Sequence, residues 1–447
     1  MLKALVIILA ALLLCAVPAG QVGGSGRIPE ETSISATDER FLEELRAADP
    51  KTAAFADAEF LAYVRRTCGI EAYRAVYQAL IRHMYTPETW HARTGKTALV
   101  LYDEYSGALD PDSPSYRSDI RVLPPSEETT ICVVGDVSFA DNYEIMPALN
   151  ERGRGLLGVL SGEVVDILRG ADILMVNSEF AFTTRGEPII GKTYTFRGDP
   201  ENVKYLQEMG TDIVTLANNH VYDYGEVGFA DTLETFRNAG IPYIGAGENV
   251  DEASRPFYFI QNGRKYAFTA ATRAEKRVLT PEATDHSSGV LRMYDMTAYL
   301  EVLREAERQC DVSIAYVHWG AEKKYETEEG LYEDAAAMIE AGADAVVGAH
   351  AHLLQEISHY NGVPIVFNLG NFLFDELTLE TAVLRLTVNR NGKMSVRMIP
   401  CLQEDRYTRL LTGTESERVF RLLRRLSPNV SIDREGNVSF RVSETAA

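Results

Sequence analysis

Short apolar segments alternate with helix-like segments from about residue 129 to residue 400. The apolar segments are Ile131–Val134, Ile173–Val176, Ile213–Leu216, Tyr266–Ala270, Val312–Val317, Ala345–Val347 and Ile365–Phe367. Between them, apolar residues at helical spacing mark Leu156–Leu168, Val227–Asn238, Tyr299–Gln309 and Tyr332–Ala341. This alternation is typical of an α/β domain whose strands are largely buried.

Different patterns flank this α/β region. Residues 39–125 carry apolar side chains at three- and four-residue spacing, which predicts a mainly helical N-terminal extension of unknown role. Within the region, residues 381–398 predict two strands joined by a turn at Asn389-Arg-Asn-Gly392. Residues 401–447 predict one amphipathic helix followed by a tail.

The N-terminus has the pattern of an export signal. Lys3 precedes an apolar run, Ala4–Val17, and small residues allow cleavage after Ala19. The run is shorter than the roughly 20 residues of a membrane span, so a signal peptide (1–19) with a flexible leader (20–38) is favoured over a retained anchor. Leu14 disfavours lipidation at Cys15, because a lipobox requires a small residue there. We expect an extracellular or cell-envelope protein.

Composition restricts the partners. The chain has 447 residues, 46% of them hydrophobic, and a formal net charge of −21. A nucleic-acid partner requires a basic surface and is therefore not expected, whereas a small anionic or polymeric substrate could be bound through a metal ion. The remaining cysteines lack the spacing of a zinc or redox motif and leave three double pairings open: Cys68, Cys132, Cys310 and Cys401. Cys132 and Cys310 are expected to be buried.

Polar residues that can bind metals or transfer protons follow six of the apolar segments. In chain order they are Asp136; Asn177 and Glu179; Asn218, Asn219 and His220; His318 and Glu322; His350 and His352; and Asn371. In open α/β sheets the carboxyl ends of the strands share one edge, where ligands bind. We therefore expect these side chains to line a common pocket.

The residue types indicate the chemistry of that pocket. Carboxylates, amides and imidazoles without cysteine suit a divalent ion such as Mn, Fe, Zn or Mg. In an extended segment His350 and His352 would direct their rings to the same side. A carboxylate such as Glu179 can bridge two ions roughly 3.5–4 Å apart, as in two-metal hydrolysis.

Six motifs, taken in order, resemble the CapA (poly-γ-glutamate capsule biosynthesis) family, which is similar to calcineurin-like metallophosphoesterases. They are Gly135-Asp136-Val-Ser138-Phe, Asn177-Ser-Glu179, Asn218-Asn219-His220-Val-Tyr-Asp223, His318-Trp-Gly-Ala-Glu322, Gly348-Ala-His350-Ala-His352 and Asn368-Leu-Gly-Asn371. The resemblance covers residues 129–400 and implies a sandwich of two mixed β-sheets flanked by helices.

The resemblance also implies roles for individual residues. Asp136 resembles the first-motif carboxylate, and Glu179 stands at the position of the bridging acid. Asn219, His318 and His350 resemble the ligands of one metal, His352 a ligand of the other, and His220 the catalytic histidine. Residues that would support these ligands or contact substrate are Ser138, Asn177, Asn218, Asp223, Glu322 and Asn371. Phosphoesterases have histidine at the position of Ser138, so one metal would lose a nitrogen ligand.

Two functions are consistent with these observations. In the first, an exported CapA-like protein acts in capsule or poly-γ-glutamate biosynthesis or export through metal-assisted hydrolysis or transfer, with one or two divalent ions and His220 as general acid. In the second, the chain is a non-enzymatic assembly or export subunit that works with other polymer-synthesis proteins at the membrane. A dinucleotide enzyme is disfavoured, because the first strand is not followed by Gly-x-Gly-x-x-Gly.

Overall fold

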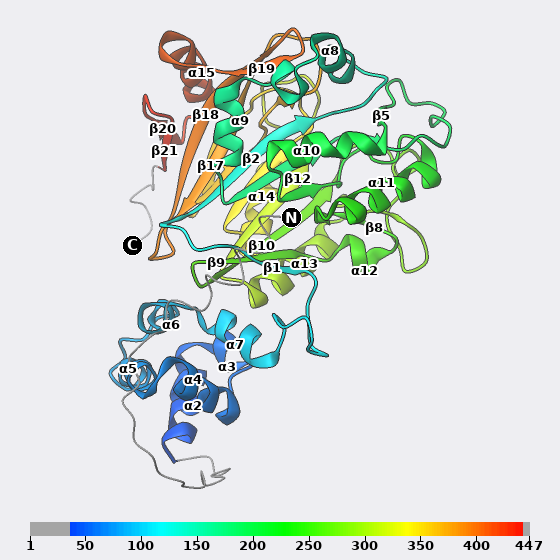
Figure 1. The fold of residues 1–447 in the computed structure, drawn as a ribbon. Helices are drawn as coiled ribbons and strands as arrows, with labels where there is room; N and C mark the ends of the chain where they lie inside the picture. Colours follow the sequence, from blue (N-terminus) through cyan, green and yellow to red (C-terminus); the bar gives the residue numbers. More distant parts are fainter. Residues whose placement is uncertain (1–35, 441–447) are drawn as a thin grey trace.

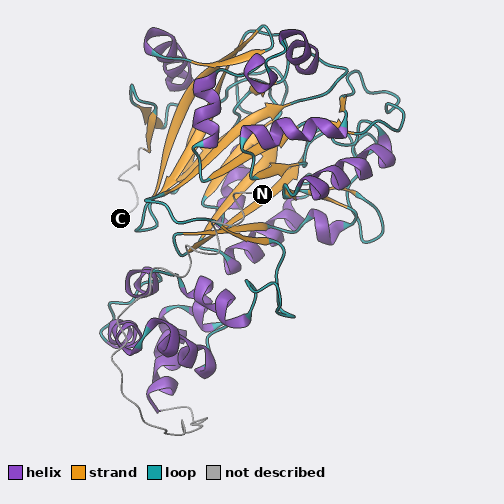
Figure 2. Ribbon diagram, in the orientation of Figure 1, coloured by secondary structure: helices purple, strands orange, loops and turns teal. Residues whose placement is uncertain are grey.

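The computed structural model describes residues 36–440. Across this span two large mixed β-sheets pack face to face, with helices on their outer sides (Figure 1 and Figure 2). The predicted two-sheet sandwich flanked by helices is therefore confirmed. The predicted signal peptide, Cys15, most of the leader and the last seven residues lie outside the described part of the chain.

Both sheets combine parallel and antiparallel neighbours. The seven-stranded sheet contains, in spatial order, β1 (Ile120–Val122), β9 (Phe257–Gln261), β10 (Arg264–Thr272), β12 (Val312–His318), β13 (Ala345–Ala349), β15 (Val363–Val366) and β14 (Ile357–Tyr360). The ten-stranded sheet contains β20 (Val430–Ile432), β21 (Asn437–Phe440), β18 (Met394–Glu404), β17 (Leu379–Val388), β2 (Thr129–Val137), β3 (Ile173–Ser178), β6 (Ile213–Thr215) and β7 (Tyr243–Ile244), with β16 (Asn371–Leu373) beside β2 and β19 (Tyr407–Leu410) beside β18.

The central strands are buried on both faces, which explains their continuous apolar sequences. In β2, Ile131 and Val133 face the other sheet, where they join Phe268 and Ile314 in one cluster. The alternate residues of β2, such as Val134, face the helices of the outer layer. Those helices are α8 (Ile145–Arg152), α9 (Gly162–Arg169), α10 (Val203–Met209) and α11 (Gly225–Ala239).

Helices α13 (Met296–Gln309) and α14 (Glu329–Glu340) cover the outer face of the seven-stranded sheet, where Leu303 and Met338 pack with Val317 and Val346. The result is a four-layer α/β/β/α arrangement. Within residues 36–440, no helix is long and apolar enough to cross a membrane.

Aspartates secure the amino ends of four parallel strands. Asp172, Asp212, Asp311 and Asp344 directly precede β3, β6, β12 and β13. A carboxylate oxygen of each accepts a backbone N–H bond from the adjacent strand, at 2.8 Å in every case, from Thr130, Leu174, Lys265 and Ser313. These bonds pair amides at the strand starts that would otherwise be left without a partner in the sheet.

The N-terminal helices form a lobe with its own core beside the turn that joins β9 to β10 (Figure 1). They are α2 (Ala36–Ala48), α3 (Pro50–Ala53), α4 (Ala58–Cys68), α5 (Ile70–Ile81), α6 (Glu88–Thr94) and α7 (Ala98–Ser106). Lys265 of β10 and Asp103 of α7 form a buried ion pair of 2.7 Å between lobe and sheet. The ring of His91 contacts the carbonyl of Asn262 at 2.8 Å, in the same interface.

Several elements differ from the sequence expectation. The segment Leu156–Leu168 is not one helix: it divides into a 3-10 turn, η1 (Gly155–Gly158), and α9, because Ser161 caps α9 through the amide of Val164. After residue 400, α15 (Gly413–Leu426) is accompanied by β19, β20 and β21, which were not predicted because they are short and complete an existing sheet edge. The four cysteines among the described residues are unpaired, and Cys132 and Cys310 are buried as expected.

Candidate metal centre

The candidate ligands come in equal numbers from the two sheets. Asp136 lies in β2, Glu179 directly follows β3, and Asn219 is in the loop after β6. From the other sheet, His318 ends β12, and His350 and His352 follow β13. The site therefore lies where the carboxyl ends of two sheets meet, and not along the single sheet edge that strand order alone suggested.

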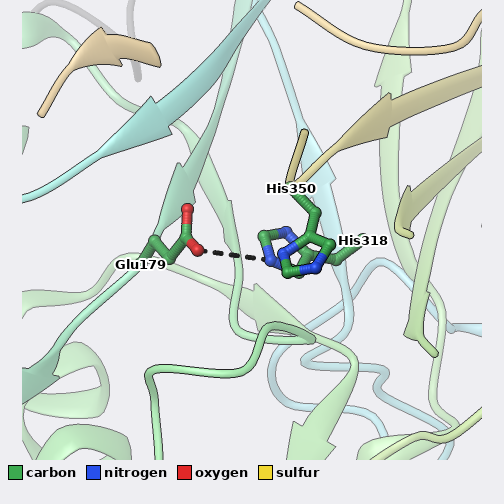
Figure 3. Close-up of side chains that lie close together, drawn as sticks. All are labelled: Glu179, His318 and His350. Carbon is green, nitrogen blue, oxygen red and sulfur yellow. Dashed lines mark ion pairs between the residues drawn. The ribbon is translucent and has the colours of Figure 1, made fainter. Parts of the chain in front are cut away.

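These side chains form one buried cluster. Oε1 of Glu179 lies 3.3 Å from Nε2 of His318 (Figure 3), and that nitrogen lies 2.8 Å from Oδ1 of Asn219. Oδ2 of Asp136 lies 3.1 Å from Nδ1 of His352. Two triads have all their ligand atoms within 4.8 Å of one another: Glu179, His318 and His350, and Asp136, Glu179 and His352. Glu179 belongs to both triads.

Unpaired polar atoms show that the cluster suits a cation. Oε1 of Glu179 and Nδ1 of His350 are buried and make no hydrogen bond to any described residue. Leaving such atoms without a partner is costly, and a bound divalent ion would satisfy both. The donor set of carboxylates, imidazoles and an amide oxygen is the one expected for Mn, Fe, Zn or Mg.

Amides surround the ligands. Nδ2 of Asn177 donates to Oδ1 of Asp136 at 2.8 Å, and Oδ1 of Asn177 accepts from Nδ2 of Asn218 at 3.0 Å. Oδ1 of Asn371 accepts from Nδ1 of His352 at 2.7 Å. Bonds of this kind fix the orientation of ligand side chains.

Two of the predicted supporting residues are less closely attached. Oε1 of Glu322 lies 4.0 Å from Nε2 of His350, and the Glu322 side chain is 50% exposed. Glu322 therefore lies beside His350, and Asn371 lies beside His352. His318 has a different neighbour, because Nδ2 of Asn177 lies 3.3 Å from its Nδ1. The hydroxyl of Ser138 accepts from the amide of Ala140, which keeps it within its own turn.

His350 and His352 reach the cluster by backbone turns. Strand β13 ends at Ala349, and the φ angles are 95° at His350 and 59° at His352. The expectation of an extended His-x-His segment was therefore wrong. Left-handed backbone is unfavourable for residues other than glycine and persists where the surroundings impose it, often at functional sites.

Burial and mutual charge determine the protonation of the cluster. Burial alone would raise the pKa of Asp136, but the hydrogen bond and charge of His352 hold it well below its usual range. Burial, together with the charge of Asp136, raises the pKa of Glu179 well above its usual value. Burial lowers the pKa of His350 to about 3 and that of His318 well below normal. Both rings are therefore neutral near pH 7, the form that binds cations.

Beside the cluster, His220 belongs to a second hydrogen-bonded group. Nδ1 of His220 lies 2.7 Å from Oδ2 of Asp223, which is fully buried. Burial lowers the pKa of His220, although the charge of Asp223 opposes this. Nζ of Lys192 lies 2.5 Å from Oδ1 of Asp223. Sequence reasoning missed Lys192 because it lies in a long loop, with no apolar strand before it to mark its position.

Two motif glycines permit close backbone contacts around the site. A Cβ on Gly135, the residue before Asp136, would lie 1.9 Å from the carbonyl oxygen of Gly370. A Cβ on Gly348 would lie 2.1 Å from the carbonyl oxygen of Phe367. Glycine is required at both positions because the backbone of a neighbouring strand or loop occupies the space of a side chain.

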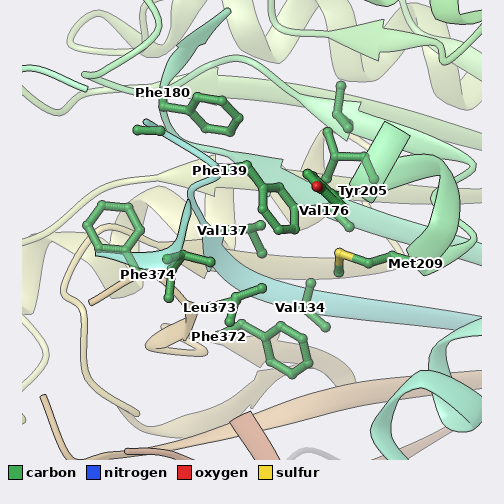
Figure 4. Packing of buried hydrophobic residues seen from close by; sticks show 14 of the residues in the cluster. Val134, Val137, Phe139, Val176, Phe180, Tyr205, Met209, Phe372, Leu373 and Phe374 are labelled. Atoms are coloured by element: carbon green, nitrogen blue, oxygen red, sulfur yellow. The ribbon is translucent and has the colours of Figure 1, made fainter. Parts of the chain in front are cut away.

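Apolar side chains adjacent to the ligands in sequence hold the site in place. Val137 and Phe139 follow Asp136, Phe180 follows Glu179, and Phe372 follows Asn371. All are fully buried and belong to one cluster between the ten-stranded sheet and its helices (Figure 4). Asp136, Glu179 and Asn371 are thus each next to a residue that is packed in the core, which limits their movement.

The fold and the site together define an α/β protein with a candidate divalent-metal centre between two sheets. The family model described as "Bacterial capsule synthesis protein PGA_cap" matches residues 130–376, and the chain belongs to this family. The resemblance noted from the six motifs is confirmed.

Two capsule or PGA biosynthesis proteins are similar to this chain in sequence. The chain is 27% identical to the capsule biosynthesis protein CapA of Bacillus anthracis, over 78% of this chain and 81% of that protein. It is 30% identical to the PGA biosynthesis protein CapA of Bacillus subtilis (strain 168), over 53% of this chain and 63% of that protein. Among solved structures, NAD nucleotidase of Haemophilus influenzae aligns with a TM-score of 0.36 and 15% identity, over 69% of this chain and 64% of that chain.

Proposed function

We propose that this chain acts at the cell envelope in capsule or poly-γ-glutamate biosynthesis, and that its metal centre hydrolyses or transfers a phosphoryl or acyl group. The observation that carries the proposal is the pair of triads that share Glu179. The names of two relatives support a role in making this polymer, because one is a capsule biosynthesis protein and the other is a PGA biosynthesis protein. A capsule lies outside the cell, which supports an exported protein and the predicted signal peptide.

In this proposal six residues hold one or two divalent ions. Asn219, His318 and His350 would hold one ion, Asp136 and His352 would hold the other, and Glu179 lies within reach of both groups. When bound, the ions supply Lewis-acid stabilisation of negative charge that develops on the reacting group. Asn177 and Asn371 keep Asp136 and His352 in place through their hydrogen bonds.

His220 is the proposed general acid. Its Nδ1 is engaged by Asp223, so only Nε2 remains to exchange a proton with the leaving group. Burial favours the neutral ring, so Nε2 first accepts the proton that the attacking water or hydroxyl group loses and then donates that proton to the leaving group. Asp223 orients the ring and stabilises the positive charge that forms on it.

Metal analysis of the purified protein tests this proposal. Wild type and an Asn219→Ala/His350→Ala double variant are stripped with chelator, reloaded with Mn²⁺ or Zn²⁺ and analysed for metal per chain. We expect one or two ions in wild type and far fewer in the double variant. His91→Ala, which alters a histidine in the lobe interface, is the matched control and should bind as wild type does. Near-zero metal in all three proteins would overturn the proposal.

One observation favours the second function, a non-enzymatic assembly subunit. The N-terminal lobe has a separate core and is joined to the sheet by a buried ion pair, away from the candidate ligands. Such a lobe could present a surface to other polymer-synthesis proteins. In that case His220→Ala would leave polymer output of a producing cell unchanged, whereas metal-assisted catalysis requires that output falls.

A further inference from the structure

The loop of residues 183–196, which joins β4 (Ala181–Phe182) to β5 (Arg197–Gly198), sends a lysine into the protein and leaves apolar residues outside. The side chain of Lys192 is only 4% exposed. Its Nζ lies 2.5 Å from Oδ1 of Asp223 and also donates to the carbonyl oxygen of Asn219. Nearby in the loop, Ile190 is 95% exposed and Tyr194 is 59% exposed. Lysine is usually exposed and large apolar residues are usually buried, so the reverse arrangement in this loop indicates that Lys192 has a specific role inside the protein.

Asp223 connects this loop to His220. Its Oδ2 accepts the amide of Phe196 and faces Nδ1 of His220, each at 2.7 Å. Its backbone oxygen accepts the amide of Ile189 at 2.9 Å. The Asp223 carboxylate is fully buried. Among the described residues, Lys192 is the lysine or arginine that forms an ion pair with it. A buried carboxylate without a counter-charge is strongly unfavourable, so Lys192 is needed to keep Asp223 in this position.

The loop also packs against His220 directly. The ring of Phe196 lies 4.4 Å from the ring of His220, centroid to centroid. Since a carboxylate only accepts hydrogen bonds, Asp223 selects the His220 tautomer that carries hydrogen on Nδ1. The hydrogen-bonded order Lys192, Asp223, His220 therefore fixes both the position and the tautomer of the imidazole.

We propose that Lys192 is a positioning residue: it joins loop 183–196 to Asp223 and thereby holds His220 with Nε2 free to meet the substrate. This inference rests on the proposed function, because only a general-acid role for His220 requires a free Nε2. A simpler role, in which Lys192 only attaches the loop, makes a different prediction about the His220 ring.

The test compares Lys192→Met with a matched control, Lys265→Met. Lys265 is an equally buried lysine, 2.7 Å from its own aspartate, Asp103, in the lobe interface. Long-range ¹H–¹⁵N spectra of histidine-labelled protein report the His220 tautomer, with His220→Gln used to assign the signal. Trypsin cleavage after Arg185 reports the order of the loop. Metal per chain is measured on separate portions of the same proteins after reloading.

We expect Lys192→Met to lose the single Nδ1–H tautomer of His220 and to be cleaved after Arg185 about tenfold faster, because the loop opens more often. Lys192→Arg, which keeps the charge, should restore the tautomer. Lys265→Met should leave both readouts unchanged. If the methionine variant does not fold, Lys192→Gln keeps a donor without the charge and is read in the same way.

An unchanged His220 signal in Lys192→Met overturns the inference, even if cleavage becomes faster, because Lys192 would then only attach the loop. Absence of metal from wild type would overturn the proposed function instead. The tautomer is read without metal or substrate, so the two failures are distinguishable.

Discussion

Oε1 of Glu179 and Nε2 of His318 lie 3.3 Å apart, although they follow strands of different sheets. Both side chains are fully buried, and the carboxylate oxygen has no hydrogen-bond partner among the described residues. The contact joins the ten-stranded sheet to the seven-stranded sheet, at the place where the other candidate ligands also lie. Four predictions follow from this arrangement and from the strands that support it.

Glu179→Gln should reduce metal binding more than the loss of either outer ligand does. Glutamine keeps the size of the side chain but removes the charge that both triads share. His350→Ala or His352→Ala removes a ligand from one triad only. Metal per chain, measured after reloading, should therefore be lowest in Glu179→Gln, and a value equal to wild type would contradict a shared ligand.

His220→Gln should slow hydrolysis without affecting metal content. Loss of a general acid typically costs 10²–10⁴-fold in rate, and His220 is absent from both ligand triads. Turnover of an activated phosphodiester and of a γ-glutamyl peptide would be compared with wild type at equal metal occupancy. A rate within twofold of wild type would remove His220 from the mechanism.

Gly135→Ala should destabilise the protein strongly. The new Cβ would lie 1.9 Å from the oxygen of Gly370, which must then move, and overpacking of this kind costs about 1–3 kcal/mol or more. Gly162→Ala at the start of α9 is the matched control, because its Cβ meets no atom within 4 Å. Urea unfolding should show a lower midpoint for Gly135→Ala alone, and equal midpoints for the two variants would refute the argument.

Asp212→Asn should alter the pH dependence of stability. Burial raises the pKa of Asp212 to about 6, despite the bond from the amide of Leu174. A raised carboxyl pKa favours folding below the unfolded value near 4, and this contribution is lost as pH rises through about 6.

Asparagine does not titrate, so the stability of Asp212→Asn relative to wild type should increase from pH 4.5 to pH 7.5. Because Asp212 is partly exposed, solvent screening limits the expected change to about 1–2 kcal/mol. Urea unfolding at both pH values measures it, and an unchanged difference between the two proteins would show that Asp212 does not titrate in this range.

The strands and most of the candidate ligands could be predicted because each depends on local sequence. Continuous apolar segments such as Ile173–Val176 predict strands buried on both faces, and each is followed by its polar residue. The sequence could not show which strands share a sheet. Asp136 and His318 lie in different sheets but reach the same site, an arrangement that depends on long-range pairing of β2 with β17 and of β12 with β10.

Two features of the site had no signal in the sequence. The left-handed backbone of His350 and His352 contradicts the general preference of non-glycine residues, and only the surrounding fold imposes it. Lys192 lies in a loop without periodicity, and its burial depends on Asp223, which is distant in sequence. A lysine in a polar loop is ordinarily assigned to solvent.

The aspartates at the amino ends of the strands have a consequence for the opposite end of the sandwich. Asp172 and Asp212 fasten strands within one sheet, and Asp311 and Asp344 fasten strands within the other. Asp172 also accepts a hydrogen bond from Nε2 of Gln261 in the other sheet, at 2.7 Å, so it joins the two sheets at this end. At the opposite end, one cation bound by ligands from both sheets would form a reversible link between them. By mass action it would add about 2.7 kcal/mol at a hundredfold excess over its dissociation constant, so chelation should loosen that end first.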